Sequence, residues 1–78
     1  MPNIKPGDLV RVKEIHPDVP PDRVQWYYNN NIVNGIYKIV GVSDYPKWPF
    51  KLNLPVKAPF YGYDLFNTIE LELVYESD

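Results

Sequence analysis

Nine prolines divide this chain of 78 residues into short segments, and several of the segments alternate apolar and polar residues. In residues 9–13, apolar Val10 and Val12 alternate with basic residues, a period of two that is typical of a strand with one buried face. Residues 50–54 repeat the alternation most clearly. Because proline removes a backbone donor from a sheet, strands in such a chain are short and are separated by turns.

We predict strands over residues 9–13, 35–43 and 50–54, and over residues 66–74 a short turn at Asn67-Thr68 followed by a closing strand. Residues 56–60 form either a further, edge strand or a loop. Gly41 indicates a β-bulge in the second strand. The chain between the first two strands is a long Pro-rich loop, in which Asp22 to Tyr28 could close one or two helical turns behind Pro21. Asn34 and the asparagines before it favour left-handed backbone at the end of this loop.

In the last predicted strand, one side carries Leu71, Leu73 and Tyr75. The other side carries Glu70, Glu72 and Val74. We expect the acidic residues at this end of the chain to be solvated, and they are Glu70, Glu72, Glu76 and Asp78.

The length predicts a single domain over residues 1–78, with an ordered core over 5–75 and an acidic tail over 76–78. The chain has no cysteine, so disulfides and thiolate metal sites cannot reinforce it. Aromatic residues make up 15% of the chain and must supply much of the packing. Residues 1–7 contain no apolar run, and no segment approaches the roughly 18 apolar residues of a membrane span. We therefore expect a cytoplasmic protein without a membrane partner.

Four motifs together resemble the small SH3-like barrel proteins of Gram-positive bacteria and their phages. They are Pro-Gly-Asp-Leu-Val-Arg-Val at residues 6–12, Gly-Ile-Tyr-Lys-Ile-Val at 35–40, Asp-Tyr-Pro at 44–46, and Phe-x-x-x-Glu-Leu-Glu-Leu-Val at 66–74. The resemblance implies an all-β, SH3-like barrel of about five short strands, which residues 70–74 close after a short turn. The chain departs from the pattern in the insertion at 16–34 and in the extended segment at 56–63. Such barrels serve as docking modules, nucleic-acid binders and subunit adaptors, so the fold implies no single activity.

Aromatic residues gather in three predicted loops, at residues 26–28, 45–48 and 60–63. Tyrosine and tryptophan offer flat faces for stacking and polar edges for hydrogen bonds, which suits binding. The competing interpretation is that they cover the ends of the barrel as extensions of the core. We expect most to be structural and one or two to be exposed. The predicted contact residues are Trp26, Tyr28, Trp48, Tyr61 and Tyr63, with Arg23 and Lys47 supplying charge.

No residue pattern indicates catalysis or a bound cofactor. His16, Asp18 and Asp22 share a loop, but their spacing is no recognised metal-ligand pattern, and a solvated turn explains them. The only serines are Ser43 and Ser77, and neither is paired with a base in any known motif. We predict that the protein is not an enzyme and has neither a metal site nor a cofactor.

The function predicted is that of a noncatalytic interaction module, a phage or prophage accessory protein that binds a host protein or a small ligand through its aromatic loops. The alternative is a nucleic-acid-binding barrel, in which bases stack on aromatic rings beside a cationic strip. That strip would consist of Arg11, Lys13, Lys38, Lys47 and Lys51. The net charge of −2 and the pI near 5.2 disfavour the alternative, because phosphate contacts need a basic surplus.

Overall fold

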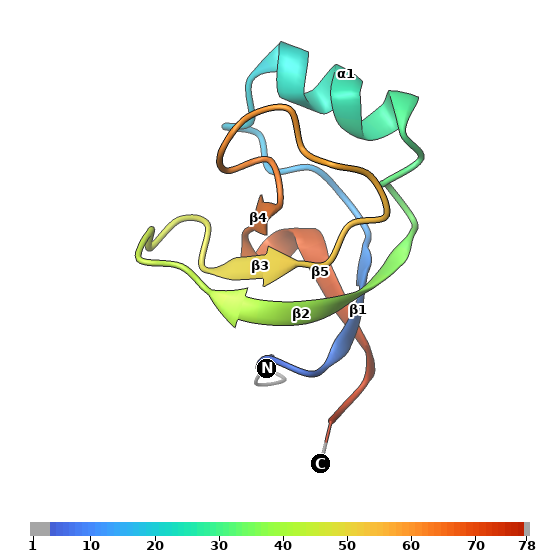
Figure 1. Cartoon of the computed structure of the whole chain (residues 1–78), viewed down its shortest axis with the longest axis vertical. Helices are drawn as coiled ribbons and strands as arrows, with labels where there is room; N and C mark the ends of the chain where they lie inside the picture. The colour runs from blue at the N-terminus through green and yellow to red at the C-terminus, as the bar shows by residue number, and fades with distance from the viewer. Residues whose placement is uncertain (1–3, 78) are drawn as a thin grey trace.

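The computed structural model describes residues 4–77, which form one five-stranded antiparallel sheet and one short helix (Figure 1). The elements in chain order are β1 (Leu9–Val12), α1 (Pro21–Asn29), β2 (Ile36–Val42), β3 (Phe50–Leu52), β4 (Leu65–Phe66), the 3₁₀ turn η1 (Thr68–Glu70) and β5 (Leu71–Tyr75). The strand order across the sheet is β4-β3-β2-β1-β5. The predicted all-β class is confirmed at this level.

β2 is the long central strand, and it joins the two halves of the sheet. Its first half pairs with β1 and its second half pairs with β3. The register shifts between Ile39 and Gly41, which confirms the bulge predicted at this glycine. Figure 1 shows β2 curving away from β1 to run alongside β3, and the pairing registers place the bulge where the strand passes from one partner to the other.

Most strand boundaries differ from the prediction by one or two residues. β3 ends at Leu52 rather than at residue 54. The turn predicted at residues 67–68 is the η1 turn, which separates Phe66 of β4 from the closing strand β5. Asn67 explains the break, since its side chain accepts a hydrogen bond from the backbone N–H of Ile69 at 3.0 Å and so starts a helical turn. Residues 56–60 are loop, the second of the two states left open for them.

The Pro-rich insertion contains a helix of nine residues, longer than the predicted one or two turns. Pro21 occupies its first turn, where no backbone donor is needed, and Pro20 before it is extended. Asn31 and Asn34 after the helix have positive φ angles of 57° and 72°, as predicted for these asparagines. Figure 1 shows α1 at one end of the molecule and both ends of the described chain, residues 4 and 77, towards the other. Among the described residues, no helix has the length and apolarity needed to cross a membrane.

The core combines residues from the sheet, the helix and the loop that follows the helix. Val10 and Val12 of β1 are fully buried, as their alternation predicts, and Tyr27 of α1 is the largest fully buried side chain. The buried hydrophobic cluster consists of Val10, Val12, Val19, Tyr27, Ile32, Ile39, Leu52, Phe66 and Leu71. A helix inserted between two strands therefore contributes a large aromatic ring to the core of the sheet.

The expectation that Glu70 is solvated is wrong, because its side chain is 0% exposed. One carboxylate oxygen accepts a hydrogen bond from the backbone N–H of Asn67 at 2.7 Å, and the other accepts one from the backbone N–H of His16 at 2.9 Å. Burial raises the pKa of Glu70, and the two backbone hydrogen bonds oppose that rise. Glu70 thus fastens the start of the long insertion to the turn before β5.

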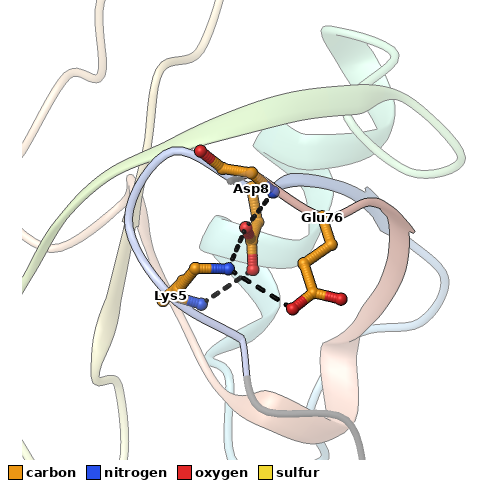
Figure 2. A network of polar contacts seen from close by, with 4 residues as sticks. Lys5, Asp8 and Glu76 are labelled. Atoms are coloured by element: carbon orange, nitrogen blue, oxygen red, sulfur yellow. Dashed lines mark hydrogen bonds and ion pairs between the residues drawn. The ribbon is translucent and has the colours of Figure 1, made fainter.

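Asp8 joins the two ends of the described chain (Figure 2). It is fully buried, and its carboxylate accepts hydrogen bonds from the backbone N–H of Ser77 at 2.7 Å and from that of Lys5 at 3.0 Å. The Lys5 ammonium lies 3.1 Å from Asp8 and 3.6 Å from Glu76. The hydrogen bond from Ser77 is the main reason why the pKa of Asp8 is lowered. Residues 76 and 77, expected to begin a free tail, are thereby held beside β1.

Candidate functional site

Arg23, a predicted contact residue, lies inside the protein with only 9% of its surface exposed. Its Nε donates a hydrogen bond to the Tyr27 hydroxyl at 2.7 Å, and its Nη2 donates one to the Leu65 carbonyl at 2.6 Å. The guanidinium carbon lies 5.0 Å from the Trp48 ring centroid and 5.5 Å and 5.6 Å from those of Tyr27 and Tyr63. We call these five residues the Arg23 cluster. It connects α1 with β4 and with two loops.

Most of the other predicted aromatic contacts pack on or within this cluster. Trp26 is half-buried, with its ring centroid 5.6 Å from that of Tyr27 and 5.4 Å from that of Tyr63. The hydroxyl of Tyr27 donates a hydrogen bond to the Tyr63 carbonyl at 2.6 Å. Trp48 is also half-buried and meets His16 edge-on at 5.2 Å. The rings of Trp26, Trp48 and Tyr63 thus help to hold the aromatic loops in place.

Two other predicted contact residues are exposed but lie apart from one another in the chain. Tyr28 projects from α1 with 58% of its surface exposed. Lys47 forms an ion pair with Asp18, and the hydrogen bond from Lys47 is the main cause of the lowered pKa of Asp18. His16 Nδ1 accepts a hydrogen bond from the backbone N–H of Asp18 at 3.0 Å. Within residues 4–77, no group of three or more His, Cys, Asp or Glu side chains is arranged to hold a metal ion.

Tyr61, the remaining predicted contact, is 81% exposed and lines an open groove of about 620 Å³. We call it the Tyr61 groove. One side is formed by the end of β2, the turn after it and β3, and the other by the loop before β4. The lining residues are Val42, Ser43, Asp44, Lys51, Lys57, Ala58, Pro59, Phe60, Tyr61, Asp64 and Leu65. A smaller extension continues from it along Val40, Leu54 and Val56 and shares Lys51, Lys57, Ala58 and Asp64 with it.

The exposed wall of the groove is attached to the protein interior just beyond Tyr61. Gly62 has a φ of 97°, and its carbonyl accepts a hydrogen bond from the Leu65 backbone N–H at 3.1 Å, which turns the chain back towards β4. The backbone carbonyls of Tyr63 and Leu65 are then held by Tyr27 and Arg23. The Arg23 cluster therefore supports the loop that presents Tyr61.

One aromatic contact connects this loop to the opposite side of the groove. The Tyr61 ring lies 6.1 Å from that of Tyr45, in the turn after β2. Within the loop itself, the Phe60 ring lies 5.8 Å from that of Tyr63. Ser43 fixes the same turn, because its hydroxyl donates to the Trp48 carbonyl at 2.6 Å and accepts from the Tyr45 backbone N–H at 3.1 Å. The groove is thus bordered by rings from two loops that are far apart in sequence.

The charges of the groove are balanced between two lysines and two aspartates. Lys51 Nζ lies 4.0 Å from Asp64 Oδ2, at the limit of an ion pair. Neither Lys57 nor Asp44 forms an ion pair with any residue in the part of the chain that the structure describes. The groove therefore presents one cation and one anion to a ligand, together with exposed rings.

Several residues that line this groove were not predicted as site residues, notably Val42, Asp44, Lys57 and Asp64. For Val42 a signal was present, since a bulge at Gly41 changes the face on which the next residue lies. Val42 is 68% exposed, although it is an apolar residue in a central strand. For the other three, the sequence carries no signal beyond their nearness to prolines or aromatics.

No protein-family model, no curated protein and no solved structure matches this chain. A function must therefore be inferred from the geometry and the chemistry of the groove.

Proposed function

We propose that the protein is a noncatalytic interaction module that binds a partner protein or a small ligand in the Tyr61 groove. The observation that carries this proposal is the exposure of three large apolar residues around one concave surface: Val42 at 68%, Phe60 at 69% and Tyr61 at 81%. Exposed apolar surface that is concave and bordered by polar groups is typical of a binding site, and tyrosine is enriched among the residues that dominate binding energy.

The rings of the Arg23 cluster differ from those of the groove, because structural contacts account for their positions. Tyr27, Trp48 and Tyr63 are explained by their packing and hydrogen bonds inside the protein. Phe60 and Tyr61 leave most of their surface in water, where such rings contribute little to stability. A role in binding accounts for their exposure.

An SH3-like barrel is the scaffold that we propose for this module. Strands β1 to β4 follow one another across the sheet, and β5 returns to pair with β1 after a short turn, as the resemblance of residues 70–74 implies. On the same resemblance, we extend the proposal to a cytoplasmic phage or prophage accessory protein whose partner is a host protein. Capture of a purified host protein by the wild type, but not by a Tyr61→Ala variant, would test this extension.

Nucleic-acid binding is the second candidate, and Lys51 and Lys57 in the groove beside Phe60 and Tyr61 favour it. Asp44 and Asp64 line the same groove, and they would repel phosphate. Together with the net charge of −2, they make a protein partner the better supported proposal.

Selection from a library of random displayed peptides tests the proposed function. We expect peptides that bind the wild type and lose at least about tenfold in affinity with Tyr61→Ala, as for an aromatic anchor at an interface. Tyr28→Ala is the matched control, because it removes an exposed tyrosine from α1, outside the groove. Peptides equally sensitive to both substitutions, or none that depend on Tyr61, would contradict the proposal. Binding of a labelled oligonucleotide at low salt that is lost in Lys57→Ala would support the second candidate instead.

A further inference from the structure

The protein already contains one arginine surrounded by aromatic rings. In the Arg23 cluster, the guanidinium lies within 5.0 to 5.6 Å of three ring centroids. A guanidinium is planar and weakly hydrated, so it stacks on aromatic faces more readily than an ammonium does. The Arg23 cluster shows the spacing at which this fold places rings around such a cation.

A second set of aromatic rings lies at the Tyr61 groove, where Phe60 and Tyr61 line the groove and Tyr45 lies beside Tyr61. Across residues 4–77, every cation–ring contact involves Arg23, and none involves Tyr45, Phe60 or Tyr61. The Tyr45 and Tyr61 rings lie 6.1 Å apart. Asp44 precedes Tyr45 in the same turn, lines the groove and has no ion-pair partner among the residues described. Rings beside an available carboxylate match the two features by which a guanidinium is recognised, its flat face and its paired donors.

We propose that the part of the Tyr61 groove lined by Asp44 and Tyr61 binds an arginine side chain from a basic segment of a partner protein. The guanidinium stacks on Tyr61, and Asp44 accepts its hydrogen bonds. This inference rests on the proposed function, and it adds the chemistry of the partner.

The distribution of charge supports a cationic segment over a phosphate-bearing ligand. Lys51 is close to Asp64, which offsets its charge. Lys57 lines the stretch that the groove shares with its extension, whereas Asp44 and Tyr61 line the main groove alone. The net charge of −2 favours association with a basic partner.

The extension gives the same segment a second point of contact. Apart from Asn53, the residues that line only the extension are apolar: Val40, Leu52, Leu54 and Val56. Val40 is 50% exposed. A partner segment with an apolar side chain a few residues from the arginine would fill the extension while the arginine occupies the main groove. Concave apolar surface with a few polar groups is the usual composition of such sites.

A titration with a small probe tests the arginine site directly. The probe is N-acetyl-arginine-N-methylamide, and its control is the citrulline analogue, which has nearly the same shape but no charge. In amide NMR spectra of the wild type, we expect saturable shifts at residues 42–45 and 60–62 with the arginine probe and at least about fivefold weaker binding of the citrulline analogue. Equal binding of the two probes, or shifts confined to other residues, would overturn the inference.

Two variants test which of two charges in the groove, that of Asp44 or that of Lys57, contacts the probe. Asp44→Asn keeps the shape of the side chain and should weaken the arginine probe by about fivefold to tenfold. Lys57→Ala removes a cation and should leave the probe binding at least as tightly as it binds the wild type. Weaker binding in Lys57→Ala, or no change in Asp44→Asn, would contradict the assignment. The displayed-peptide selection separates this inference from the proposed function: Tyr61-dependent peptides that lack arginine would refute the inference alone.

Discussion

Replacing Arg23 by methionine should remove a large part of the stability of this protein. Methionine keeps a long apolar side chain but lacks the guanidinium that donates to the Tyr27 hydroxyl and to the Leu65 carbonyl at 2.7 and 2.6 Å. A hydrogen bond to a charged group contributes roughly 1.5–3 kcal/mol, and removing a buried charge recovers part of its desolvation cost. The expected net loss is about 2–4 kcal/mol, against a total of roughly 4–12 kcal/mol for a domain of this size.

Urea unfolding followed by tryptophan fluorescence measures the loss, because Trp48 lies 5.0 Å from the guanidinium and reports on the Arg23 cluster. With a slope of about 1 kcal/mol per molar urea, the midpoint should fall by about 2–4 M. Lys47→Met is the matched control, since Lys47 is exposed and its pair with Asp18 lies at the surface, so its midpoint should change little. If Arg23→Met unfolds at the wild-type midpoint, Arg23 is not structural, and the sequence-based prediction of a contact residue regains its force.

Three further predictions test how the rest of the interior is held. Stability should fall as the pH drops through the lowered pKa of Asp8, because the folded state binds that proton less tightly than the unfolded chain does. Urea midpoints measured from about pH 7 to about pH 2 check this. If Asp8→Asn loses stability at low pH as steeply as the wild type does, the expectation is contradicted. Glu70→Gln should lower the free energy of unfolding in urea by about 1–3 kcal/mol, because an amide oxygen replaces only one of the two carboxylate acceptors. In the wild type, the raised pKa of Glu70 makes stability decline as the pH rises from the unfolded-state pKa towards the folded-state pKa, and Glu70→Gln should abolish this decline. A variant with the wild-type midpoint and pH profile would refute both expectations. Gly7→Ala should lower the melting temperature and Gly41→Ala should not, because Gly7 has a φ of 98° and an added Cβ would lie 2.9 Å from Ser77 Oγ, whereas Gly41 has open space; equal melting temperatures would count against this.

The sequence predicted those parts of the fold that depend on neighbouring residues. Alternation identified the buried valines of β1 and the position of β3, and Gly41 indicated the bulge in β2. Pro21 indicated the start of the helix, because proline suits a first helical turn. Each of these signals is local, and local signals were sufficient to place most of the strands.

The interior polar contacts could not be predicted in this way, because their partners are distant in sequence. Glu70 accepts a hydrogen bond from a residue 54 positions away, and Arg23 donates one to a residue 42 positions away. In a sequence, a charged residue in a strand or loop indicates solvent, and only the folded arrangement shows that its hydrogen bonds are satisfied inside.

The candidate site was predicted in part. Of the residues expected to make contacts, Tyr61 lines the groove, while Arg23, Trp26, Trp48 and Tyr63 pack inside or against the interior. The groove is assembled from the end of β2, from β3 and from the loop before β4, and no spacing pattern connects three such segments. Aromatic content alone cannot distinguish a ring that supports a loop from one that the loop presents.

The central claim is that Phe60 and Tyr61 bind a ligand while the Arg23 cluster holds the loops that present them. Amide NMR spectra of the wild type, titrated with a peptide selected by display, test it most directly. We expect shift changes at residues 42–45 and 57–65, with the helix residues 26–30 unaffected. Changes centred on α1, with the Tyr61 groove unperturbed, would contradict the claim.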